Sequence, residues 1–88
     1  MKINPKYKVR RVADEDIVLV QGRNPGDMST VIALNETSLF LWHNLEGRDF
    51  EQHDVAELLL QRFEVDDDRA HKDAQAWIQQ LKENGILI

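Results

Sequence analysis

The side chains that could do chemistry are few in this sequence. It contains three histidines, His43, His53 and His71, and no cysteine. No histidine has a second histidine or a cysteine at the spacing of metal ligands, and direct neighbours such as His53 and Asp54 point to different faces of a helix. The sequence therefore predicts no metal site, and the lack of cysteine excludes disulfides and thiolate chemistry.

Patterns of catalytic residues are also missing. No serine lies in the strand–turn–helix context of a nucleophile elbow. Gly22 and Gly26 lack the flanking residues of a P-loop or of a dinucleotide-binding loop, so we interpret residues 22–27 as a turn. These observations predict no catalytic residue and leave binding as the class of function to examine.

The backbone of one predicted strand could form hydrogen bonds with a binding partner. Residues 28–34 are apolar and partly β-branched, and two earlier stretches, 7–12 and 17–21, also suit strands. Short polar turns join the three stretches, which predicts an antiparallel meander with 28–34 at an edge of the sheet. Free N–H and C=O groups on that edge would suit strand addition by an extended peptide; alternatively, the chain's end or a second copy covers the edge.

Three helices are expected after the strands. Asn35 is a good N-cap for the first helix, and Gly47 can end it. Apolar residues from Val55 to Phe63 at helical spacing predict a second helix that begins near residues 52–54, and Asp66 or Asp67 can cap a third. The expected fold class is α+β, a three-stranded antiparallel sheet followed by three helices, similar to a winged helix.

Length and charge indicate a single domain and argue against one class of function, nucleic-acid binding. The 88 residues fit one domain over 1–88. The net charge is −5, and residues 51–88 carry four Lys/Arg against nine Asp/Glu, whereas residues 1–50 are balanced. The acidic helical part argues against nucleic-acid binding. Lys6, Lys8 and Arg10 would share one face of the first strand, where they either contact an acidic partner or nucleic acid, or lie in solvent.

The sequence also bears on location. Residues 1–5 lack the apolar core of a signal peptide, and no apolar run is long enough to span a membrane. We therefore expect a cytoplasmic protein that does not bind membranes.

The centre of the chain resembles a known family. The run Leu34-Asn35-Glu36-Thr37-Ser38, followed by Leu41-Trp42 and by Leu45-Glu46-Gly47, is similar to the signature of PqqD-like proteins. The likeness continues through apolar positions of the later helices to the closing Gly85-Ile86-Leu87 and covers about residues 5–88.

This resemblance implies a non-catalytic peptide chaperone. PqqD-like proteins act in the biosynthesis of pyrroloquinoline quinone (PQQ), where they bind a precursor peptide and present it to a radical S-adenosylmethionine enzyme. Their fold is shared by recognition elements that bind the leader peptides of ribosomally made, modified peptides. The resemblance thus implies no enzymatic activity and no cofactor in this chain, and it implies two partners, a precursor peptide and a radical or other peptide-modifying enzyme.

The resemblance also indicates where the peptide binds. In that family the leader adds a strand beside the third strand, and its side chains enter a groove beside the third helix. The predicted peptide-binding residues are Ser29, Thr30, Val31, Ile32 and Ala33 on the strand, and Ala70, Asp73, Ala74 and Trp77 on the helix. Ala70 and Ala74 would leave a shallow slot with Asp73 at its rim or in solvent, whereas Trp77 is expected mainly in the core.

Two other functions are left open by the residues. A winged-helix nucleic-acid binder would need a basic recognition helix, yet the third helix begins with aspartates at 66–68. A structural or dimerisation module would use the same edge strand for self-pairing. Leu39 and Phe40 place more apolar surface on the first helix than packing needs, so we expect one of them to be exposed at an interface. The expected state is a monomer or a weak homodimer.

Overall fold

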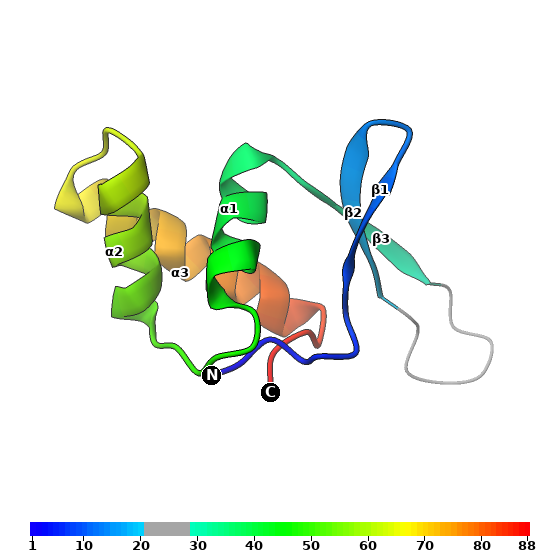
Figure 1. Cartoon of the computed structure of the whole chain (residues 1–88). Helices are drawn as coiled ribbons and strands as arrows, with labels where there is room; N and C mark the ends of the chain where they lie inside the picture. The colour runs from blue at the N-terminus through cyan, green and yellow to red at the C-terminus, as the bar shows by residue number, and fades with distance from the viewer. Residues whose placement is uncertain (21–28) are drawn as a thin grey trace.

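The computed structural model describes residues 1–20 and 29–88, and it has the predicted α+β fold. A three-stranded antiparallel sheet lies at one end of the molecule, and three helices follow it on one side (Figure 1). The elements are β1 (Val9–Val12), β2 (Glu15–Val20), β3 (Thr30–Leu34), α1 (Glu36–Leu45), α2 (Gln52–Arg62) and α3 (Asp67–Glu83). The turn predicted over 22–27 lies outside the described residues.

β1 and β2 form a hairpin whose turn has only two residues. Val12 pairs with Glu15, and between them Ala13 and Asp14 have φ angles of 51° and 66°. Two successive positive φ angles characterise the type I′ turn, whose twist matches that of the flanking strands. The second strand, predicted over residues 17–21, therefore begins two residues earlier than expected, since Glu15 and Asp16 belong to β2.

This turn leads to a prediction on stability. A left-handed conformation costs a residue with a Cβ atom about 1–2 kcal/mol, and Asn-Gly is the pair that type I′ turns favour. Replacing Ala13-Asp14 by Asn-Gly should therefore raise the free energy of unfolding by about 1 kcal/mol, which is a rise of roughly 4–8 °C in Tm for a domain of this size. Thermal unfolding followed by circular dichroism measures it, and an unchanged or lower Tm would contradict the type I′ turn.

The sheet has one buried and one open face. Side chains of successive strand residues point to opposite faces, and Val18, Val20 and Ile32 are buried towards the helices. Leu19 and Val31, which pair with one another across β2 and β3, point the other way and are exposed. The side chains of β3 therefore alternate between the two faces, with Ile32 directed to the core.

Very little chain separates β3 from α1. β3 ends at Leu34, and Asn35 caps a helix that begins at Glu36. The Asn35 side chain accepts a hydrogen bond of 2.8 Å from the backbone N–H of Ser38, which satisfies a donor that the first helical turn leaves free. Since the cap fixes the direction in which α1 starts, it also fixes β3 relative to the helices.

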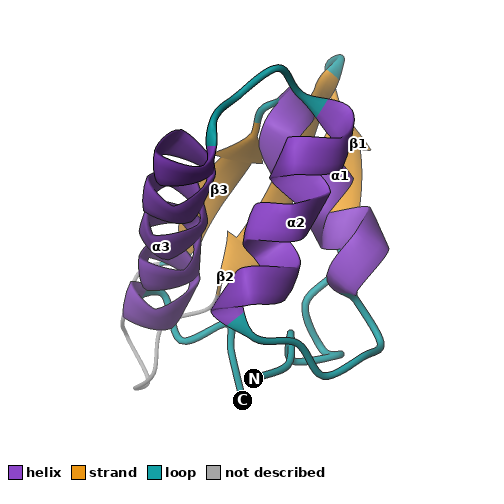
Figure 2. Cartoon of the chain, turned by 90° about the vertical axis from the view of Figure 1, so that its left-hand side faces the viewer, coloured by secondary structure: helices purple, strands orange, loops and turns teal. Residues whose placement is uncertain are grey.

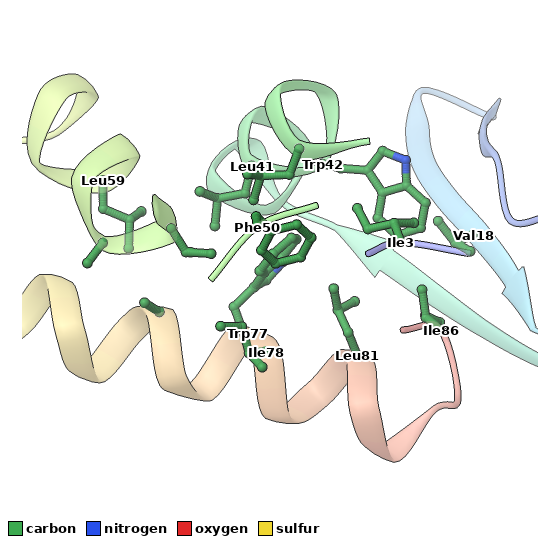
Figure 3. Packing of buried hydrophobic residues seen from close by; sticks show 14 of the residues in the cluster. Ile3, Val18, Leu41, Trp42, Phe50, Leu59, Trp77, Ile78, Leu81 and Ile86 are labelled. Carbon is green, nitrogen blue, oxygen red and sulfur yellow. The ribbon is translucent and has the colours of Figure 1, made fainter. Parts of the chain in front are cut away.

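The core lies between the helices and the buried face of the sheet (Figure 3). Its largest fully buried side chains are Trp42 and Phe50, and α3 contributes a stripe that includes Trp77, Ile78 and Leu81. The Trp42 indole N–H donates to a carboxylate oxygen of Glu46 at 3.0 Å, so its polar atom is satisfied. Trp42 is thus the centre of the packing between α1 and the rest of the domain.

The two chain termini pair with each other rather than with β3. Ile3 forms an antiparallel bridge with Leu87, and the backbones of Lys2 and Ile88 exchange hydrogen bonds of 3.0 and 2.8 Å. The termini lie side by side in both views of the chain (Figures 1 and 2). The last residues of the chain therefore pair with the N-terminal residues and do not cover β3.

The expected exposure of Leu39 or Phe40 was wrong. Both side chains are half-buried. The Phe40 ring packs edge-on against Phe63, with ring centroids 5.8 Å apart, and the Arg62 guanidinium lies 5.9 Å from the Phe40 centroid. The C-terminal end of α2 thus covers part of the Phe40 ring.

Candidate functional site

The two edges of the sheet differ in charge. In the order β1-β2-β3, both β1 and β3 are edge strands, and within the described residues no strand pairs with the outer side of either. β1 carries Arg10 and Arg11, and charged side chains on an edge oppose pairing with another chain. β3 has no charged residue. β3 is therefore the edge that is open to strand addition.

The hairpin determines which backbone groups of β3 face outwards. In a two-residue hairpin the closing pair, here Val12 and Glu15, exchanges hydrogen bonds, and bonded pairs alternate with non-bonded pairs from there on. The β2 residues that bond to β3 are then Asp16, Val18 and Val20, through Leu34, Ile32 and Thr30. Val31 and Ala33 consequently direct their N–H and C=O groups to the free edge.

A groove begins where β3 ends. It has a volume of about 300 Å³ and lies between the start of α1 and one face of α3. α1 and its cap contribute Asn35, Thr37 and Ser38, and α3 contributes Asp73, Ala76, Trp77 and Gln80. Figure 2 shows α3 running along the same side of the molecule as β3. The open edge and the groove therefore adjoin at Asn35.

The groove combines an apolar floor with a polar rim. Leu41, Leu59 and Trp77 are almost fully buried, and they form its apolar part. At the rim, the Asp73 carboxylate accepts from the Arg69 Nε–H at 3.0 Å, and the Arg69 and Asp73 side chains are 69% and 46% exposed. An exposed pair four residues apart on a helix contributes only about 0.3–0.5 kcal/mol, so a cationic ligand could replace Arg69 at little cost. The groove can thus hold an apolar side chain next to a cationic or hydrogen-bonding group.

One comparison with known proteins bears on this arrangement. The family model described as Coenzyme PQQ synthesis protein D (PqqD) matches residues 11–87. The chain belongs to the PqqD family. This family has a peptide-binding role in PQQ biosynthesis, and its members are non-catalytic accessory proteins. No curated protein and no solved structure matches the chain.

The residues that match the PqqD family include every residue predicted for peptide binding. The predicted residues on the strand differ in exposure. Ser29, Thr30, Val31 and Ala33 are exposed. Ile32 is buried, and its backbone bonds to β2, so neither its side chain nor its N–H is available to a peptide. The available part of β3 is therefore narrower than the sequence indicated, with Val31 and Ala33 at its centre.

Of the four residues predicted on α3, two line the groove and two lie in the core. Asp73 and Trp77 line the groove, but Ala70 and Ala74 are completely buried in the core and open no slot. Sequence reasoning missed Ala76, whose small side chain leaves room in the groove. Asp73, Ala76, Trp77 and Gln80 recur at helical spacing and share a face, but this face is partly polar, so a search for an apolar stripe does not find it.

Acidic and histidine side chains do not converge on a common point in the part of the chain that is described. Among residues 1–20 and 29–88, no three of the side chains of His, Asp and Glu could hold a metal ion together. One expectation was wrong in detail, because His53 Nε2 and Asp54 Oδ1 approach to 3.5 Å although they are direct neighbours. No helix within these residues is long and apolar enough to cross a membrane.

Proposed function

We propose that this protein is a non-catalytic chaperone that captures the precursor peptide of PQQ biosynthesis by strand addition to β3. It would then present the peptide to a peptide-modifying enzyme such as a radical S-adenosylmethionine enzyme. The observation that carries the proposal is the uncharged edge of β3, where Val31 and Ala33 direct free backbone groups outwards beside an apolar groove.

Backbone pairing and side-chain burial have separate tasks in this proposal. Hydrogen bonds to Val31 and Ala33 would fix the register of an extended peptide without regard to its sequence. An apolar side chain in the groove would add about 1.5–3 kcal/mol before the cost of ordering the peptide. Because a disordered precursor bears that ordering cost on binding, we expect a Kd in the range of roughly 0.1–10 μM.

The position of the edge supports a presenting role. One residue separates β3 from α1, and the Asn35 cap holds this junction in place. The edge and the groove are thus preorganised relative to one another, which reduces the ordering that the protein must undergo on binding. The peptide alone would change its conformation, and a partner enzyme would receive it in a defined orientation.

Filling the groove tests the contribution of the side chains. Ala76 lies on the groove, and we expect Ala76→Trp to weaken binding of the precursor peptide at least tenfold, which is about 1.4 kcal/mol. Stability should change little, because Ala76 is exposed. Isothermal titration calorimetry with the precursor peptide of the same pathway measures the Kd.

The matched control for this substitution is Gln79→Trp. Gln79 is also exposed on α3 but does not line the groove. The Gln79→Trp variant should bind the precursor peptide with the same Kd as the unmodified protein. If Ala76→Trp leaves the Kd unchanged, or if both variants weaken binding equally, the groove does not receive the peptide. If the unmodified protein does not bind the precursor peptide, the proposed function itself is wrong.

A further inference from the structure

The open face of the sheet, opposite the helices, has an apolar centre, and the register places the charged residues Arg10 and Glu15 beside it. Val12, Leu19 and Val31 are 54%, 42% and 57% exposed, and they are three of the five large apolar side chains that are exposed in the described part of the chain. The register places Leu19 beside Val31 and Ile17 beside Ala33 on this face. In Figure 1 all three helices lie on the other side of the sheet. An exposed apolar cluster of this kind, here called the outer sheet face, is typical of an interaction surface.

One border of the outer sheet face is basic. Lys6, Tyr7, Lys8 and Arg10 line a hollow of about 280 Å³ that reaches Leu19. The Lys6 ammonium lies 5.1 Å from the centroid of the Tyr7 ring. Within residues 1–20 and 29–88, none of these three cations takes part in an ion pair. A positive border is notable on a protein with a net charge of −5, and it favours an occupant with acidic groups around an apolar centre.

We propose that the outer sheet face docks the peptide-modifying enzyme through an acidic, amphipathic segment of that enzyme. This inference rests on the proposed function and adds a second surface to it. Val31 connects the two surfaces, because its backbone faces the free edge while its side chain lies on the outer sheet face. An enzyme docked there would lie next to a peptide paired with β3. Capture and delivery would then use adjoining surfaces that do not compete.

Charge argues against the other occupants of this face. A second copy placed face to face would bring the same basic border to the contact, so it would add cations and not the acidic groups that Lys6, Lys8 and Arg10 lack. Contact with the acidic start of α3 in another copy would be head-to-tail and would extend into a filament rather than close. A nucleic acid would meet an apolar centre in place of further cations. An acidic protein segment satisfies both the border and the centre.

Charge reversal on the border tests the inference. The probe is the purified radical S-adenosylmethionine enzyme of the same pathway, and surface plasmon resonance measures its binding to the full chain. We expect the double substitution Lys8→Glu/Arg10→Glu to weaken enzyme binding at least tenfold, mainly through a slower association rate. The same double substitution should leave the Kd for the precursor peptide within about twofold, since neither residue lies on β3 or in the groove.

The matched control is Lys72→Glu/Lys82→Glu, the same change of charge at two exposed positions of α3. It should leave enzyme binding unchanged. Equal enzyme binding by Lys8→Glu/Arg10→Glu and by the unmodified protein would overturn the inference, as would a lack of enzyme binding by the unmodified protein. If light scattering shows a dimer, and if Leu19→Glu abolishes that dimer, the outer sheet face binds a second copy instead of the enzyme. In each of these cases, intact peptide binding would leave capture of the peptide on β3 standing, whereas a lack of enzyme binding by the unmodified protein would also contradict presentation to the enzyme.

Discussion

Replacing Val31 by proline should weaken binding of the precursor peptide by at least about 30-fold, or roughly 2 kcal/mol. The hairpin geometry directs the Val31 N–H to the free edge, so proline removes a donor that pairs only with a bound peptide. The pyrrolidine ring would also occupy space that the added strand needs. Stability should fall only slightly, because proline is tolerated where a strand's N–H faces solvent. Calorimetric titration and thermal unfolding measure both quantities.

The other edge of the sheet offers a matched control. By the same alternation, the Arg11 N–H points away from β2, so Arg11→Pro removes an outward donor from β1. This variant should bind the peptide with an unchanged Kd. Val31→Ala separates the backbone from the side chain, since it keeps the N–H, and we expect its Kd to stay within about threefold. Folded Val31→Pro that binds the peptide normally would exclude strand addition on β3.

Replacing Trp42 by alanine should lower the free energy of unfolding by about 3–5 kcal/mol. Trp42 is fully buried, and its ring is among the largest in the core (Figure 3). A loss of this size is a large part of the 5–15 kcal/mol that typically stabilises a domain, so we expect the variant to be partly unfolded at 37 °C. Urea unfolding followed by circular dichroism measures the change.

Glu46→Gln separates packing from hydrogen bonding at Trp42. The amide oxygen of glutamine can still accept from the indole N–H, and Glu46 is exposed, so this variant should lose at most about 1 kcal/mol. If Trp42→Ala cost no more than Glu46→Gln, Trp42 would not be the centre of packing that its burial indicates.

The order and type of the elements followed directly from the sequence. Asn35 and Asp66 cap α1 and α3 as expected, because a cap depends on a side chain and a backbone group only three residues apart. Gly47, which was predicted to end the first helix, has a positive φ angle of 81° after the end of α1. The edge position of β3 was also predicted, because hairpins join neighbours in sequence into neighbours in space.

The candidate site was predicted less completely, because it depends on contacts between distant segments. Ala70 and Ala74 were expected to open a slot, but α2 packs against α3 and the two alanines are buried in the core. Ile32 was predicted to bind the peptide because every residue of the strand was included. In the structure its backbone N–H and C=O groups bond to β2 and are not free for a peptide. The type I′ turn at Ala13-Asp14 lacks the Asn-Gly pair that marks such turns in a sequence. The sequence therefore could not show which residues of β3 bond to β2 and which direct their backbone groups to the free edge.

Amide hydrogen exchange followed by NMR tests strand addition on β3 most directly. In the free protein, the amides of Val31 and Ala33 should exchange fast, and those of Ile32 and Leu34 should be protected by pairing with β2. Saturation with the precursor peptide should protect Val31 and Ala33 and leave Arg11, on the opposite edge, unchanged. Protection of Val31 and Ala33 in the free protein, or their continued fast exchange in the saturated complex, would contradict the account.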